Sequence, residues 1–165
     1  MKYSNWLIVN ISFLLFFSLY LGIVGSEKSN FIFLSNLFSH LAILFFLMNL
    51  LMFFIISLIK KSNKRQVKKF FARFLRKYFK THIPFAITGS SLILVHAVFN
   101  LSHTGLLLGY HHPKMISGYT ALFLLTINLI AGYFRYQRAS GPRRKFHLYS
   151  ALLFTGAFFI HIFLR

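Results

Sequence analysis

Four histidines share a spacing that would place pairs of imidazoles on two helices. His82 and His96 are separated by thirteen residues, and so are His147 and His161. In an α-helix, a step of 14 residues rises about 21 Å and returns to within about 40° of the same direction. Each pair therefore lies on one face of its helix, at two depths.

Facing imidazoles can hold a haem iron, because the porphyrin supplies the other four ligands. Zinc instead needs four protein ligands, and the sequence has no Cys, no Asp and a single Glu, Glu27. We therefore expect two haem b groups with histidine as both axial ligands. The alternative is that each imidazole only hydrogen-bonds a neighbouring helix, which contributes about 0.6 to 2 kcal/mol.

The elements that position these histidines are apolar and long. The composition is 57% hydrophobic and only 12% charged, which excludes an ordinary soluble domain. Five apolar stretches approach the ~20 residues that cross a bilayer, so we expect an all-α protein with five transmembrane helices; they are 6–24, 37–59, 83–108, 115–133 and 146–164. The first stretch also resembles a signal peptide, but its length favours a retained helix within 1–25.

The cations predict the orientation, because cytoplasmic loops collect Lys and Arg. Ten of the 19 lie between Lys60 and Lys80, and five more lie between the fourth and fifth stretches. Both connections should be cytoplasmic, with the N-terminus inside, the C-terminus outside and the third and fifth helices parallel. This arrangement pairs His82 with His147 at the inner level and His96 with His161 at the outer level.

The cytoplasmic segment 60–80 is also amphipathic. Apolar residues recur at steps of three and four between Val67 and Phe79, with cations on the opposite face. This pattern predicts a separate interfacial helix on anionic lipid rather than a nucleic-acid site. A partner protein with an acidic face is an alternative.

Small and basic residues are secondary candidates for cofactor binding. A flat macrocycle approaches a helix most closely where side chains are missing, which singles out Gly89 and the pair Gly118 and Gly132, again fourteen apart. Haem propionates favour cations near the membrane faces. These are Arg144 and Lys145 at the inner level and Lys114 at the outer level. Ordinary helix packing and topology are the alternative explanations for both groups.

The other four histidines are expected near the outer surface. His103 is seven residues beyond His96, so a continuous α-helix would place both on one face, about 10 Å apart. His40 is expected to be a buried hydrogen-bonding residue. His111 and His112 belong to a turn before Pro113 that is expected to be a solvated loop.

Two helices with this histidine spacing resemble the membrane domains of ferric reductases and NADPH oxidases and the haem-bearing half of cytochrome b. The resemblance covers roughly 37–165, and its segments are THIPFAITGSSLILVHAVFN and RRKFHLYSALLFTGAFFIHIF. It implies a four-helix bundle with two haems, the four histidines as axial ligands, and Gly118 and Gly132 beside the haems. The second helix departs from it, because it lacks a glycine pair. A flavin and nicotinamide domain is also missing, and the sequence has no G-x-G-x-x-G.

We therefore expect a single transmembrane domain over 1–165 that carries electrons across the membrane. An iron with two histidine ligands has no open position for a substrate, so a relay is expected rather than a complete enzyme. Its partners would be redox subunits, quinone or an extracytoplasmic cytochrome, and the first helix would dock a partner subunit. The alternatives are a metal-ion transporter and a cofactor-free membrane scaffold.

Overall fold

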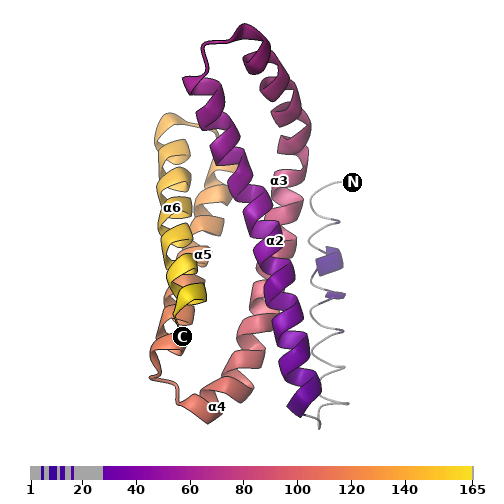
Figure 1. Cartoon of the computed structure of the whole chain (residues 1–165), viewed down its shortest axis with the longest axis vertical. Coiled ribbons are helices and arrows are strands. Elements are labelled where there is room, and N and C mark those ends of the chain that lie inside the picture. The colour runs from indigo at the N-terminus through magenta and orange to yellow at the C-terminus, as the bar shows by residue number, and fades with distance from the viewer. Residues whose placement is uncertain (1–4, 6–7, 11, 14–15, 17–27, 165) are drawn as a thin grey trace. The chain divides into compact units, whose positions relative to one another are not determined.

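The computed structural model describes residues 5, 8–10, 12, 13, 16 and 28–164. Most of the predicted first helix, 6–24, lies outside the described residues. From Lys28 onward the described chain is almost entirely helical and contains no strand, so the all-α prediction is confirmed. The elements are α2 Lys28–Lys61, α3 Arg65–Phe99, the π-helix η1 Asn100–Thr104, α4 Gly105–Leu108, α5 Pro113–Gln137 and α6 Gly141–Phe163 (Figure 1).

Four stretches of helix among the described residues are long and apolar enough to cross a membrane. They correspond to the second to fifth predicted helices, and they make the chain a multi-pass membrane protein; their bounds are Phe33–Lys61, Arg65–Leu108, Pro113–Gln137 and Gly141–Phe163. The chain divides into two compact units, 1–99 and 100–165, which are described separately below.

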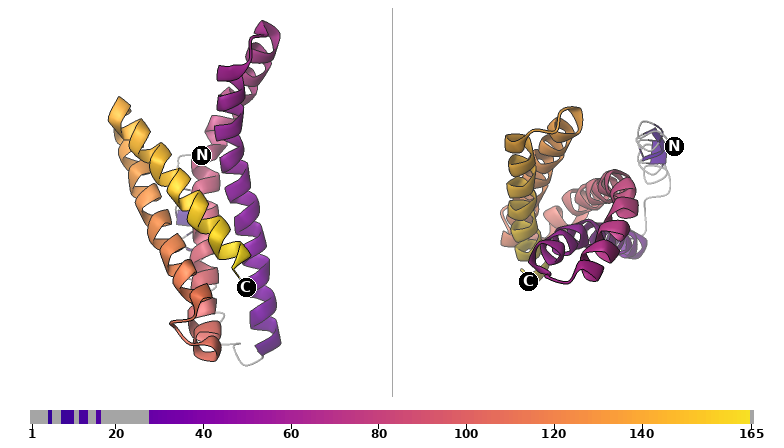
Figure 2. Two further views of the ribbon diagram at one scale, coloured as in Figure 1. Left: turned by 60° about the vertical axis from the view of Figure 1, so that its left-hand side comes forward. Right: turned by 90° about the horizontal axis from the view of Figure 1, so that it is seen from above.

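In the first unit, α2 and α3 form an antiparallel hairpin, because only three non-helical residues, 62–64, connect them (Figure 2). Two apolar clusters hold the helices together. One includes Phe38, Ala42, Leu92, Val95 and Phe99. The other, nearer the connection, includes Met52, Ile55 and Leu75.

Gly89 allows the two helices to approach closely between these clusters. A Cβ at this position would lie 3.2 Å from Cβ of Phe45 and 4.0 Å from the carbonyl oxygen of Ala42, both on α2. The structure thus gives Gly89 a helix-packing contact, and its role beside a haem stays a prediction.

The amphipathic segment within 60–80 is not a separate helix. Residues 60 and 61 end α2, and 65–80 are the first half of α3, which continues through Pro84; contact with anionic lipid stays a prediction. Its apolar face packs on α2, where Leu75 contacts Met52 and Ile55. Pro84 removes one backbone hydrogen bond within α3, and packing on the neighbouring helix allows α3 to continue past it. Part of the apolar face stays uncovered, since Phe70 is 68% exposed.

The C-terminal end of α3 also departs from the expected continuous helix. Residues 100–104 form a π-helical turn, in which hydrogen bonds run over five residues rather than four. The turn changes the angular step per residue before His103 is reached. The seven-residue step from His96 to His103 assumed α-helical geometry throughout, which the π-helical turn contradicts, and a face shared by the two histidines stays a prediction.

In the second unit, α5 and α6 form a hairpin whose helices begin with side-chain caps (Figure 2). His112 precedes Pro113 at the start of α5, and its Nδ1 accepts from the backbone N–H of Lys114 at 3.2 Å. Ser140 caps α6 by accepting from the N–H of Arg143 at 3.5 Å. His112 thus has a structural role, since a cap satisfies an N–H group that the helix itself leaves open.

We expect Gly89→Leu to destabilise the α2–α3 hairpin by about 1 to 3 kcal/mol, because the added side chain would overpack the contact with Phe45. Thermal unfolding in detergent, followed by circular dichroism, measures the change. Gly156→Leu is the matched control, because no atom lies within 4 Å of a Cβ at that position of α6. Equal stability of the two variants would contradict the packing role.

Candidate functional site

His96 hydrogen-bonds α2 through Nδ1. This atom lies 3.2 Å from the carbonyl oxygen of Ser35 and 3.2 Å from the Ser35 hydroxyl. A carbonyl oxygen can only accept, so Nδ1 of His96 carries the ring proton and donates it. In the neutral ring, Nε2 then carries the lone pair that a metal ligand requires.

His82 contacts α2 through Nδ1 as well, but its partner is Asn49. With the amide oriented to satisfy all its neighbours, the nitrogen of Asn49 donates to Nδ1 of His82 at 2.8 Å and to the His82 carbonyl oxygen at 3.2 Å. The amide oxygen then accepts from the backbone N–H of Ala86 at 3.2 Å. Both α3 histidines are therefore oriented by hydrogen bonds with the same neighbouring helix, His96 as donor and His82 as acceptor.

The two α2 partners repeat the spacing of the histidines. Ser35 and Asn49 are fourteen residues apart, as are His96 and His82 on the antiparallel helix. The sequence analysis missed this pair, because it searched α2 for glycines. The sequence signal for this pair is the recurrence of a polar residue at the histidine spacing on the preceding apolar helix.

In the second unit, α5 places Gly118 and Ser117 against His161. A Cβ on Gly118 would lie 3.1 Å from Cε1 of the imidazole. The Ser117 hydroxyl donates to the Lys114 carbonyl oxygen at 2.8 Å and lies 3.0 Å from Nδ1 of His161. Because that hydroxyl has one proton, it accepts from His161, so Nδ1 of His161 also carries the ring proton.

Gly132 stands in the same relation to His147. A Cβ there would lie 3.4 Å from Cε1 and 3.6 Å from Nδ1 of the imidazole, and this Nδ1 is buried. One turn further along α6, the Ser150 hydroxyl bonds the His147 carbonyl oxygen and Oδ1 of Asn128, each at 3.0 Å. The fourteen-residue glycine pair of α5 thus faces the fourteen-residue histidine pair of α6.

Cations close both ends of the α5–α6 hairpin. The Lys114 ammonium donates to the carbonyl oxygens of Leu164 at 2.6 Å and His161 at 2.7 Å, at the end of α6. Arg143 donates to the Phe134 carbonyl oxygen at 3.0 Å, at the end of α5, and lies over the Phe134 ring. Cations at helix C-termini interact favourably with the unpaired carbonyls. The sequence analysis did not single out Arg143.

Arg144 and Lys145, the inner cation candidates, are exposed in the first turn of α6. Contact of Lys114, Arg144 or Lys145 with a propionate stays a prediction. His40 is exposed, and its Nδ1 bonds the Asn36 carbonyl oxygen of its own helix at 2.6 Å. The expectation that His40 is buried is wrong, because its intrahelical bond satisfies the ring without a second helix.

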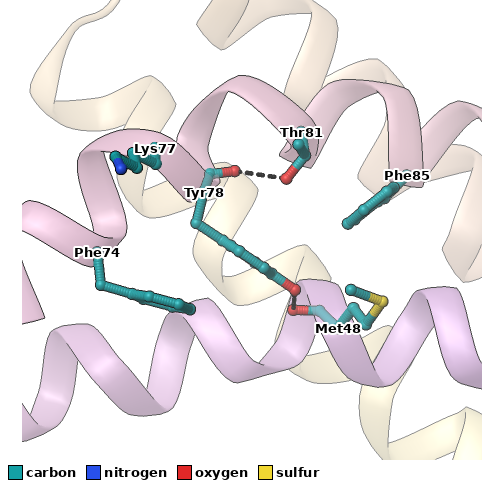
Figure 3. A pocket seen from close by; sticks show the side chains of 6 residues that line it. All are labelled: Met48, Phe74, Lys77, Tyr78, Thr81 and Phe85. Atoms are coloured by element: carbon teal, nitrogen blue, oxygen red, sulfur yellow. Dashed lines mark hydrogen bonds between the residues drawn. The ribbon is translucent and has the colours of Figure 1, made fainter.

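A shallow apolar groove lies between α2 and α3, about one turn from His82. It encloses about 260 Å³ and is lined by Met48, Phe74, Lys77, Tyr78, Thr81 and Phe85 (Figure 3). The Tyr78 hydroxyl donates to the Met48 carbonyl oxygen at 2.7 Å, and the Thr81 hydroxyl donates to the Tyr78 carbonyl oxygen at 2.8 Å. The Tyr78 bond anchors α3 to α2 four residues before His82, whereas the Thr81 bond lies within α3.

The histidines are chemically compatible with a haem iron, and haem binding stays a prediction. Among the described residues, no three or more His, Cys, Asp or Glu side chains gather to hold an ion. A haem iron needs only two protein ligands, and the histidines and the glycines opposite two of them match that requirement. The pairing of His82 with His147 and of His96 with His161 joins the two units and stays a prediction.

No protein-family model, curated protein or solved structure matches this chain.

We expect Lys114→Met to destabilise the α5–α6 hairpin by about 1 to 2 kcal/mol, since it removes charge-assisted hydrogen bonds to the end of α6. Hydrogen exchange of the last turn of α6 measures the effect as faster exchange. Lys145→Met removes the same charge from an exposed position and should leave that turn unchanged. Equal exchange in both variants would contradict the capping role of Lys114.

Proposed function

We propose that this protein carries electrons across a membrane through two b-type haems, each with two histidine ligands. His82 and His147 would hold the inner haem, and His96 and His161 the outer one. The chain would be the cytochrome b subunit of a larger membrane oxidoreductase, similar in its ligand arrangement to ferric reductase membrane domains and cytochrome b.

The observation that carries this proposal is the fourteen-residue spacing, which recurs on all four long helices. Within each hairpin, residues at that spacing on one helix contact the two histidines of the other, so each histidine has a matched neighbour. On α2 the contacting residues are Ser35 and Asn49, and on α5 they are Gly118 and Gly132. The interval on α2 and α5 follows from the histidine spacing, because adjacent helices share the same rise per residue, so the proposal is supported by the equal spacing of the two histidine pairs themselves.

The residues contribute orientation rather than bond chemistry. Bound haem supplies reversible one-electron transfer at its iron. A hydrogen bond donated by Nδ1–H fixes the ring and tautomer of an axial histidine and raises its basicity. Because histidines occupy both axial positions, the sites favour electron relay over substrate binding. Two haems held at histidine levels about 21 Å apart would together cover most of the ~30 Å hydrocarbon core.

The cation distribution supports a cell (inner) membrane location with both basic connections cytoplasmic. The N-terminus would be cytoplasmic and the C-terminus extracytoplasmic, with a fifth spanning helix before α2. The uncovered apolar and basic faces of α3 would contact anionic lipids. Redox partner subunits, quinone or an extracytoplasmic cytochrome would donate and accept the electrons.

Dithionite-reduced minus oxidised spectra of the purified protein test the proposal. We expect a b-haem α-band with two haems per chain. His96→Ala and His161→Ala should each remove the outer haem, about half of the total, because each deletes one axial ligand. His40→Ala should retain both haems, since Nδ1 of His40 bonds the Asn36 carbonyl oxygen of its own helix. A colourless wild-type protein would exclude the electron-relay function.

The α5 glycines provide a second test of the two levels. Gly118→Leu should displace His161 and lower occupancy of the outer haem by tenfold or more, whereas Gly132→Leu should act on the inner haem through His147. Potentiometric titration of the α-band distinguishes the two haems. Gly156→Leu, in open space on α6, should change neither. If the first two variants lost both haems equally while remaining folded, the assignment of levels would be wrong.

A further inference from the structure

The described hydrogen bonds distinguish the outer histidines from His82. At the outer level, Nδ1 of His96 donates to the Ser35 carbonyl oxygen, and Nδ1 of His161 donates to the Ser117 hydroxyl. Both rings therefore hold the proton on Nδ1, the tautomer whose Nε2 can bind iron. These two rings need no proton rearrangement to become ligands.

At the inner level the direction of the hydrogen bond to His82 is reversed. The Ala86 N–H can only donate and the His82 carbonyl oxygen can only accept, so the Asn49 amide is oriented with its oxygen toward Ala86 and its nitrogen toward His82. In that orientation Asn49 donates to Nδ1 of His82, and the ring proton belongs on Nε2. Coordination through Nε2 requires that proton to move to Nδ1. Nδ1–H then needs an acceptor, and rotation of the Asn49 amide by 180° would present its oxygen.

We propose that Asn49 is a positioning residue that switches the tautomer of His82 and thereby makes the inner haem site differ from the outer one. This inference rests on the proposed function. After rotation, the amide nitrogen would face the Ala86 N–H, and the amide oxygen would face the His82 carbonyl oxygen. Three favourable contacts of the Asn49 amide are replaced by one, so the inner site takes up haem less readily than the outer site.

An asparagine suits this role because its amide both donates and accepts within one planar group. Glycine at position 49 would have no side chain to interact with either tautomer, and aspartate would only accept. Ser35, at the equivalent position fourteen residues earlier, presents a backbone carbonyl oxygen that no side-chain rotation can reverse. The two α2 positions thus share a register but differ in the chemistry they offer.

Asn49→Asp and Asn49→Leu test the proposal by shifting the inner haem potential in opposite directions. The carboxylate accepts from both Nδ1–H and the Ala86 N–H, so it should increase ligand basicity, lower the potential and tighten haem binding. Leucine removes the acceptor and should raise the potential. For each Asn49 variant we expect the midpoint potential of the inner haem to shift by about 59 mV in a redox titration. At a fixed ambient potential, this shift is roughly a tenfold change in the ferric-to-ferrous ratio.

The matched controls are Asn36→Asp and Asn36→Leu, which make the same changes at an exposed position of α2. They should leave the inner potential unchanged. Shifts of the same sign in both Asn49 variants, or no shift, would overturn the inference, because a merely structural role does not predict opposite signs.

Nitrogen-15 NMR of histidine-labelled protein purified without haem provides a readout independent of the cofactor. We expect the proton on Nδ1 in His96 and His161 and on Nε2 in His82, with Asn49→Asp moving the His82 proton to Nδ1. A proton on Nδ1 of His82 in the wild type would overturn the inference. Failure to bind any haem would refute the proposed function, whereas two haems with an insensitive inner potential would refute this inference alone.

Discussion

The register of the two helices within each hairpin depends on the hydrogen-bonding needs of imidazoles in an apolar medium. Lipid offers no water to a polar side chain, so a histidine within a spanning helix requires partners from the protein. In the first hairpin, α2 meets this need at two depths through Ser35 and Asn49. Each contact is possible only if the helices keep one register, which the apolar clusters on both sides of Gly89 maintain.

The two hairpins use the same interval with different chemistry. On α2 the residues at the histidine levels contribute polar groups, whereas on α5 the corresponding positions, Gly118 and Gly132, leave space beside the rings. Lys114 and Arg143 stabilise the second hairpin by placing a cation from the start of each helix on the final carbonyls of the other. The ends of that hairpin are therefore held by charge, while its middle remains open to close approach of the imidazoles.

Local sequence patterns were reliable where the structure depends on a single helix. The apolar runs correctly predicted α2, α5 and α6, because a spanning helix satisfies its own backbone. The amphipathic segment before Lys80 misled the prediction, since its apolar face has two possible partners, lipid or another helix. Leu75 packs on α2, and the segment continues without a break into the rest of α3. The π-helical turn before His103 was not predicted for a related reason, because hydrophobic periodicity does not reveal it.

By itself, the sequence determined that this is a helical membrane protein with two histidine pairs at a common interval. It could do so because hydrophobic length and residue spacing are properties of one segment. Only the tertiary structure decided that Ser35 and Asn49 hydrogen-bond the α3 histidines and that the α5 glycines face the α6 histidines. Those contacts depend on the rotation and offset of one helix against its neighbour, which side-chain packing sets and linear spacing does not encode.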